Sequence, residues 1–210
     1  MSSLKRNINT ETENENKRLK KKIDNNQLFF KNHINIIDTS NVNIDVKIKL
    51  YENILPELNN NYEKLKLEKK IAETYFELEQ YDKSIEKYEL LLKKYNFKNS
   101  NNIASYEDIY IDLYIDIGYC YYNLFNYKKA NEIFLKIKDN CIKYYNIEHK
   151  NTLNIENSIA YCHIHLKDYK IAETLIEKLI PKMNKIYGNN HCETILLNKN
   201  LMKCKKKLII

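Results

Sequence analysis

Three stretches of the chain repeat one order of apolar and small positions. In each stretch an isoleucine precedes a small residue, and larger residues follow it at steps of three or four. Such steps place side chains on one face of an α-helix, so the pattern predicts helices with one buried face. The three sets are Ala72, Tyr75, Leu78, Tyr81, Ser84, Tyr88 and Leu91; Gly118, Tyr121, Leu124, Tyr127, Ala130, Phe134 and Ile137; and Ala160, His163, Leu166, Tyr169, Ala172, Ile176 and Leu179.

A short polar turn divides each copy into two helices. The turns read EQYD, FNYK and KDYK, and the small residue of the first helix lets the second helix approach closely. An antiparallel pair of this kind cannot bury its apolar face alone, so neighbouring pairs must stack. We therefore predict an all-α fold, a right-handed α-solenoid of antiparallel helix pairs. It should contain about three such pairs and a terminal capping helix.

This pattern resembles the tetratricopeptide repeat (TPR), in which small and aromatic residues mark the contact between helix A and helix B. The usual TPR period is 34 residues, whereas these copies begin 46 and then 42 residues apart. The loops are similar to the long-repeat TPRs of the kinesin light chain type, where a His-Pro-Asp-Thr run opens the next helix. At the position of that proline, this chain has Lys150 in one loop and Cys192 in the other. The loops YYNIEHKNTL (144–153) and IYGNNHCETI (186–195) align Tyr145 with Tyr187, His149 with His191, and Thr152 with Thr194.

The resemblance covers residues 62–207 and suggests a domain plan. We expect a TPR domain over residues 42–210, with repeats near 62–95, 106–144 and 152–187 and a capping helix at 193–207. Residues 1–41 hold nine asparagines and mixed charge, which predicts a disordered arm. In residues 42–58 apolar and polar residues alternate, as they do in a strand, but the apolar residues also fit one face of a helix. We favour the helix, because an isolated strand would have no partner.

Composition narrows the classes of function. Only two glycines and two prolines occur, which argues against a glycine-rich phosphate-binding fold. The net charge of +7 is spread along the chain, so nucleic-acid binding gains weak support. Five cysteines without a CxxC pair predict reduced thiols. With no secretory or membrane-spanning segment, we expect an intracellular protein, cytoplasmic or, if KRLKKK (17–22) is an import signal, nuclear.

The segment YCHIH (161–165) suggests a metal site or a catalytic thiol. His163 occupies a position that points into its own helix pair, Cys162 faces the neighbouring pair, and His165 lies on the opposite face. Zinc needs ligands that converge on one point, so packing is the favoured interpretation. His149 and His191 precede helix starts, which favours a capping role. Because sequence motifs of enzymes are also missing, we expect no enzyme, no cofactor and no metal.

Binding is expected on the concave side of the solenoid, which A helices line. Tyrosines there would supply contact area, and amides would hydrogen-bond an extended peptide. The leading hypothesis is an adaptor that binds a peptide or helix of a partner protein. The alternatives are a structural subunit of a larger protein or ribonucleoprotein assembly, and a helical-repeat RNA-binding protein. The predicted groove residues are Phe76, Tyr119, Tyr122, Asn123, Asn157, Tyr161 and His165.

Overall fold

A computed structural model of the chain describes residues 28–40, 42–95, 97 and 103–209. These residues form helices joined by short connections, and no strand occurs among them. The chain divides into two compact units, residues 1–74 and 75–210. The predicted all-α helical-repeat fold is confirmed.

The first unit contains the helices that precede the repeats and most of the first helix of the first repeat. Residues 28–39 are helical, and they are followed by α2 (Ile44–Ile54), a 3-10 turn (Leu55–Glu57) and α3 (Asn61–Glu77), which crosses the boundary between the units. The helical interpretation of residues 42–58 is confirmed for α2, where Ile48 and Tyr51 are buried. A strand at this position would have left its backbone groups unpaired.

Helical structure at residues 28–39 differs from the disorder expected for the whole of residues 1–41. The carboxylate of Asp38 accepts hydrogen bonds from the Tyr51 hydroxyl and the Lys70 ammonium. Its backbone carbonyl accepts a third, from Lys47 Nζ at 3.3 Å. Ile37 beside it is buried. These partners are far away in the sequence, so composition could not indicate them. Most of the expected arm, including residues 17–22, lies outside the described residues.

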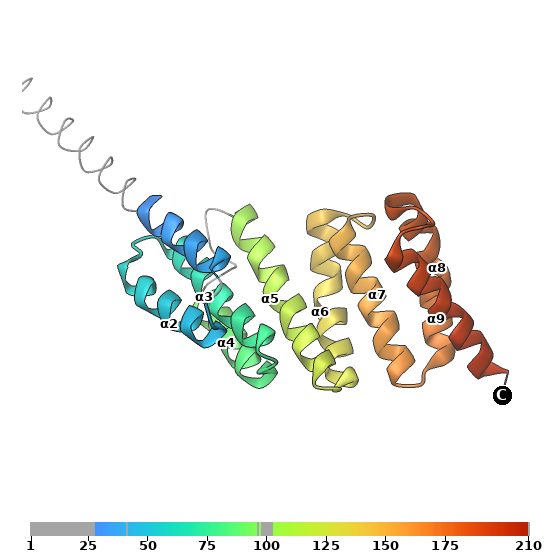
Figure 1. Cartoon of the computed structure of the whole chain (residues 1–210). Coiled ribbons are helices and arrows are strands. Elements are labelled where there is room, and N and C mark those ends of the chain that lie inside the picture. The colour runs from blue at the N-terminus through green and yellow to red at the C-terminus, as the bar shows by residue number, and fades with distance from the viewer. Residues whose placement is uncertain (1–27, 41, 96, 98–102, 210) are drawn as a thin grey trace, which may run out of the picture. The chain divides into compact units, whose positions relative to one another are not determined.

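The second unit is a series of antiparallel helices, seen side by side in Figure 1. Each helix packs against the next one along the chain. The odd-numbered helices α5, α7 and α9 are the A helices of their repeats, and α4, α6 and α8 are the B helices. Their bounds are α4 (Tyr81–Lys94), α5 (Ile103–Asn123), α6 (Tyr127–Tyr145), α7 (Lys150–His165), α8 (Tyr169–Tyr187) and α9 (Cys192–Leu208).

The turns within the helix pairs all close in the same way. Glu79, Phe125 and Lys167 occupy equivalent positions and have φ of 58°, 59° and 67°. This left-handed conformation ends the first helix and lets the next backbone N–H reach a free carbonyl. The bonds run from Gln80 N–H to Tyr75 O (3.0 Å), from Asn126 N–H to Tyr121 O (2.9 Å) and from Asp168 N–H to His163 O (2.9 Å).

The loops between repeats also share one construction. Asn146 and Gly188, which are 42 residues apart, have φ of 90° and 88° and end α6 and α8. A histidine then caps the following helix and stacks on the tyrosine that ends the preceding one. His149 Nδ1 accepts from Asn151 N–H (3.2 Å), and its ring lies 4.4 Å from that of Tyr145; His191 Nδ1 accepts from Glu193 N–H (3.3 Å), and its ring lies 4.7 Å from that of Tyr187. The capping role predicted for both histidines is confirmed.

Close approach of helices in the core depends on the small residues of the repeated pattern. A Cβ atom on Gly118 of α5 would lie 2.5 Å from the nearest ring carbon of Phe134 on α6, so the two helices leave no room for a side chain. Three cysteines also follow the repeat. Cys120, Cys162 and Cys204 are spaced 42 residues apart, and all three side chains are 0% exposed. The same period therefore continues into α9, which occupies the position of an A helix.

Candidate functional site

The A helices of the second unit form one continuous layer. Ser158 Oγ on α7 donates a hydrogen bond to the hydroxyl oxygen of Tyr119 on α5, at 3.2 Å. Towards the C-terminal ends of the same helices, the Tyr122 hydroxyl and His165 Nε2 are joined at 2.9 Å. We call the side of this layer that carries Tyr119, Tyr161 and Lys203, at equivalent positions of α5, α7 and α9, the A-helix face.

Tyr119 is anchored more firmly than the sequence suggested. Its ring meets Phe134 edge to face, with centroids 5.3 Å apart. Burial is the main cause that raises the pKa of its hydroxyl. Its backbone carbonyl accepts a hydrogen bond from Asn123 Nδ2 at 2.9 Å, so this predicted amide is already engaged. Tyr119 therefore supports the A-helix face and shows only part of its surface there.

Tyr122 and His165 belong to an aromatic group at the turns. Tyr127, which opens α6, stacks on the His165 ring at 4.3 Å and meets Tyr122 edge to face at 5.2 Å. Burial raises the pKa of Tyr122 to about 12, so its hydroxyl keeps its proton. The pKa of His165 is lowered, first by burial and second by the nearby Lys203. A neutral imidazole therefore meets a protonated phenol.

Asn157 and Tyr161 lie at the centre of the layer. Asn157 is only 6% exposed, which makes it part of the floor and not a surface contact. Its amide oxygen has no hydrogen-bond partner among the described residues. Burial is the main cause that raises the pKa of the Tyr161 hydroxyl; Asn157 lowers it, and of the α9 residues Glu193 raises it and Asn200 lowers it. Leu197 and Cys204 of α9 belong to one core cluster with Leu153 and Ala160 of α7, which places α9 beside α7.

Phe76 occupies the position in the first repeat that Tyr122 has in the second. Its ring meets that of Tyr81 edge to face, with centroids 5.2 Å apart, as Tyr122 meets Tyr127. Both aromatic residues thus pack across their own turn. The structure brings Tyr119, Tyr122, Asn123, Asn157, Tyr161 and His165 together on α5 and α7, and most of them are less exposed than the sequence analysis expected.

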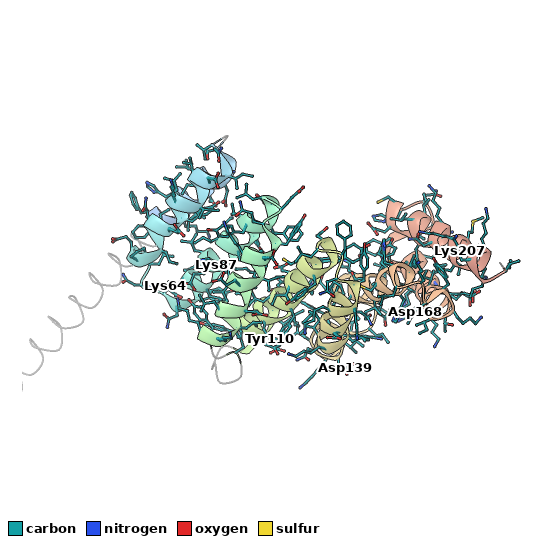
Figure 2. The ribbon with its side chains drawn as sticks, turned by 90° about the horizontal axis from the view of Figure 1, so that it is seen from below. Lys64, Lys87, Tyr110, Asp139, Asp168 and Lys207 are labelled. Carbon is teal, nitrogen blue, oxygen red and sulfur yellow. The ribbon has the colours of Figure 1, made fainter. Side chains whose placement is uncertain are left out.

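Sequence reasoning missed a row of cations on α9. The period of 42 residues aligns Asn157, Tyr161 and His165 of α7 with Lys199, Lys203 and Lys207 of α9. All three lysines are exposed, and Lys207 is labelled in Figure 2. The signal that could have found them was present, because the match of His149 with His191 already carries the period into α9. A capping helix alone does not predict this row of lysines.

The Cys162–His165 cluster is not a site. Cys162 is fully buried in the core with α5 and α6 residues, and burial raises the pKa of its thiol to about 12. His163 instead pairs with Asp168 at 3.1 Å, while His165 stacks on Tyr127. A reactive thiol needs a lowered pKa, so this cysteine is a packing residue. Among the described residues, no group of His, Cys, Asp or Glu side chains could hold a metal ion.

Comparison with known proteins supports the helical-repeat architecture. Residues 70–95 match the family model of the tetratricopeptide repeat. No curated protein sequence matches the chain. A variant of a putative kinesin light chain of Podospora anserina, with nearly identical TPR-like repeats, superposes with a TM-score of 0.58 at 13% identity, over 91% of this chain and 86% of that one.

The fold is that of a tetratricopeptide-repeat protein. BtubC (BKLC) of P. vanneervenii shares this fold, with a TM-score of 0.62 and 13% identity over 80% of this chain and 68% of that one. The apo form of RapI gives a TM-score of 0.65 at 22% identity, over 79% of this chain and 44% of RapI. At these identities the likeness concerns the TPR fold alone. None of the described helices is long and apolar enough to cross a membrane.

Proposed function

We propose that this chain is a non-enzymatic TPR adaptor that binds a segment of a partner protein on its A-helix face. The observation that carries the proposal is the change of side chains from one A helix to the next at three equivalent positions of the A-helix face. Ile115, Tyr119 and Asn123 on α5 give way to Asn157, Tyr161 and His165 on α7, and to Lys199, Lys203 and Lys207 on α9.

The three lysines of α9 would select the charge of the partner. They are spaced four residues apart and therefore lie in one row on the helix, where like charges repel by a few tenths of a kcal/mol per pair. No ion pair of these lysines occurs among the described residues. A partner carboxylate opposite this row would relieve the repulsion and gain charge-assisted hydrogen bonds. The partner segment should therefore be acidic where it crosses α9.

The part-exposed tyrosines would supply the remaining contact area. Tyr119 is held by the hydrogen bond from Ser158, and Tyr161 packs against the core cluster of α7, α8 and α9, so binding would cost little side-chain entropy. The buried amide oxygen of Asn157, which has no hydrogen-bond partner among the described residues, lies one helical turn before Tyr161 on α7. Tyrosine rings held in place beside the row of lysines on α9 suit an extended acidic segment of a partner.

Selection from a random library of displayed peptides tests the proposal. Full-length wild-type chain is the bait, and selected peptides are then measured against Lys203→Glu. We expect the peptides to be enriched in Asp and Glu and to lose affinity at least about tenfold on this variant, which corresponds to about 1.4 kcal/mol. Because Lys203 is exposed, the variant should melt at nearly the same temperature as the wild type.

A matched charge reversal provides the control. Lys128 is exposed on α6, a B helix, and Lys128→Glu should leave the affinity of the selected peptides unchanged. Selected peptides that bind Lys203→Glu as tightly as wild type would contradict the proposal. So would a selection without enrichment of acidic residues.

A further inference from the structure

The last helix is an A helix that lacks a B helix among the described residues. By the 42-residue period, Ile195, Met202 and Lys206 of α9 correspond to Leu153, Ala160 and Ile164 of α7. The α7 residues are 0%, 0% and 5% exposed. By contrast, Ile195 is 41% exposed and Met202 is 72% exposed, and Lys206 is also exposed. We call Ile195, Met202 and Lys206 the α9 outer face.

The preceding repeat shows what such a face normally contacts. Leu153, Ala160 and Ile164 belong to one core cluster with apolar residues of α8, the B helix of the same repeat. The residues that α8 contributes are Ala172, Ile176, Leu179 and Met183. The α9 outer face therefore has the position of a helix-binding surface, and its opposite side, with Leu197 and Cys204, is already used for packing on α7 and α8.

The lysines of the α9 outer face indicate the charge of the helix that would bind there. Lys199 and Lys206 flank Met202 on the exposed side of α9, and neither takes part in an ion pair among the described residues. Lys205, by comparison, pairs with Glu177 of α8 at 2.8 Å. We infer that the α9 outer face binds an acidic amphipathic helix of another protein, packed in the position of a B helix. Apolar residues of that helix would cover Ile195 and Met202, and its carboxylates would meet the lysines.

A second copy of this chain fits the same face poorly. If two α9 helices packed in parallel, Lys199 and Lys206 would each face the same residue of the other copy. In an antiparallel pair centred on Met202, Lys199 would face Lys205. Either arrangement brings like charges together in a desolvated contact, which opposes association. An acidic helix turns the same charges into attraction.

A synthetic helix provides the probe. The peptide has the sequence of α8 with Pro181 replaced by alanine and its four lysines replaced by glutamate. The control peptide carries the same alanine but keeps the lysines. Binding of the fluorescein-labelled peptides to the full chain is measured by anisotropy. We expect saturable binding of the acidic peptide, and at least about tenfold weaker binding of the control peptide.

Variants locate the contact. Met202→Glu should weaken binding of the acidic peptide at least about tenfold, while Lys128→Glu on α6 should change it less than about twofold. The chain has three methionines, and Met183 is fully buried. In a methyl NMR spectrum of ¹³C-methionine-labelled protein, the Met202 signal should therefore shift on binding and the Met183 signal should stay.

Several outcomes would overturn this inference. They are absence of binding by the acidic peptide, equal binding of both peptides, and a shift of Met183, which would mean that the peptide had displaced α8. Concentration-dependent self-association that Met202→Glu abolishes would assign the face to a second copy. Binding to phosphatidylserine vesicles that the same variant abolishes, without peptide binding, would assign it to a lipid surface.

Discussion

At the scale of single residues, the turns hold unfavourable backbone conformations in residues other than glycine. Phe125 and Lys167 adopt φ near 60°, a region where a side chain costs about 1 kcal/mol or more. The sequence could not reveal this, because neither residue is typical of such a position. Hydrogen bonds from the following N–H groups to carbonyls of the preceding helix compensate for the cost. Gly188, by contrast, is the residue type usually found at positive φ.

Lys167→Gly should therefore stabilise the protein. We expect the free energy of unfolding to rise by about 0.5–1 kcal/mol, because glycine adopts positive φ without steric cost. The measurement is urea unfolding followed by circular dichroism. Lys178→Gly in the exposed middle of α8 is the control, and it should lower stability by about 1 kcal/mol. Equal destabilisation by both variants would mean that Lys167 makes an important contact.

His165 should make stability depend on pH. Its pKa in the folded protein lies below the ordinary value of 6.5, because it is partly buried and faces Lys203. The unfolded chain therefore binds more protons between these two pKa values, so stability falls as the pH is lowered through this range. Below the folded pKa the loss levels off.

The measurement compares wild type with His165→Asn. Urea midpoints are determined from about pH 7.5 to about pH 5.5, the range in which histidine titrates. Wild type should lose stability relative to the variant as the pH falls. Parallel curves for the two proteins would show that His165 has an ordinary pKa in the folded state. The variant also corrects for the other histidines of the chain.

At the scale of helices, much of the architecture could be predicted because the pattern is local. Steps of three and four residues predicted the buried faces of α5 to α8, and the polar turns predicted where these helices end. Residues 28–39 were missed because Asp38 is held by Tyr51 and Lys70, which lie far away in the sequence. The residues that share the A-helix face were predicted in part. Its residues on α5 and α7 are adjacent, but burial of Asn157 depends on packing between repeats that spacing alone does not give.

Gly118 offers a direct test of the contact between helices. Alanine in the middle of an exposed helix usually stabilises relative to glycine, by about 0.5–1 kcal/mol. Here the added methyl group would overlap the Phe134 ring, so we expect Gly118→Ala to destabilise by about 1–3 kcal/mol.

A double-mutant cycle isolates this contact. Phe134→Leu creates space opposite Gly118, so the double variant should be more stable than the sum of the two single effects predicts, by at least about 0.5 kcal/mol. Thermal and urea unfolding measure all four proteins. Additive effects would mean that α5 and α6 are not held as closely as the structure indicates.

At the scale of the whole molecule, the cysteines report on how the stack opens. Cys192 is exposed, whereas Cys120, Cys141, Cys162 and Cys204 are buried. In a stack where each repeat contacts only its neighbours, the terminal elements open at lower free energy than the central ones. The thiols therefore should react in an order set by their position in the stack.

We expect Cys192 to react with N-ethylmaleimide at once and Cys204 next. Cys120, Cys141 and Cys162 should react later, since their exposure requires opening within the stack. Burial also raises the pKa of the thiols of Cys120 and Cys162, to about 11 and about 12. Pulsed labelling followed by mass spectrometry of peptides gives the order. Simultaneous reaction of the four buried thiols would indicate a single cooperative opening.

The matching loops before α7 and α9 have a practical consequence for building longer versions of this protein. His149 and His191 cap their helices and stack on tyrosines in the same manner, so the chain leaves both joints in nearly identical geometry. The 42 residues from 150 to 191 consequently begin and end at interchangeable junctions. Inserting a duplicate of this segment after residue 191 should extend the array by one helix pair, with no new linker to engineer.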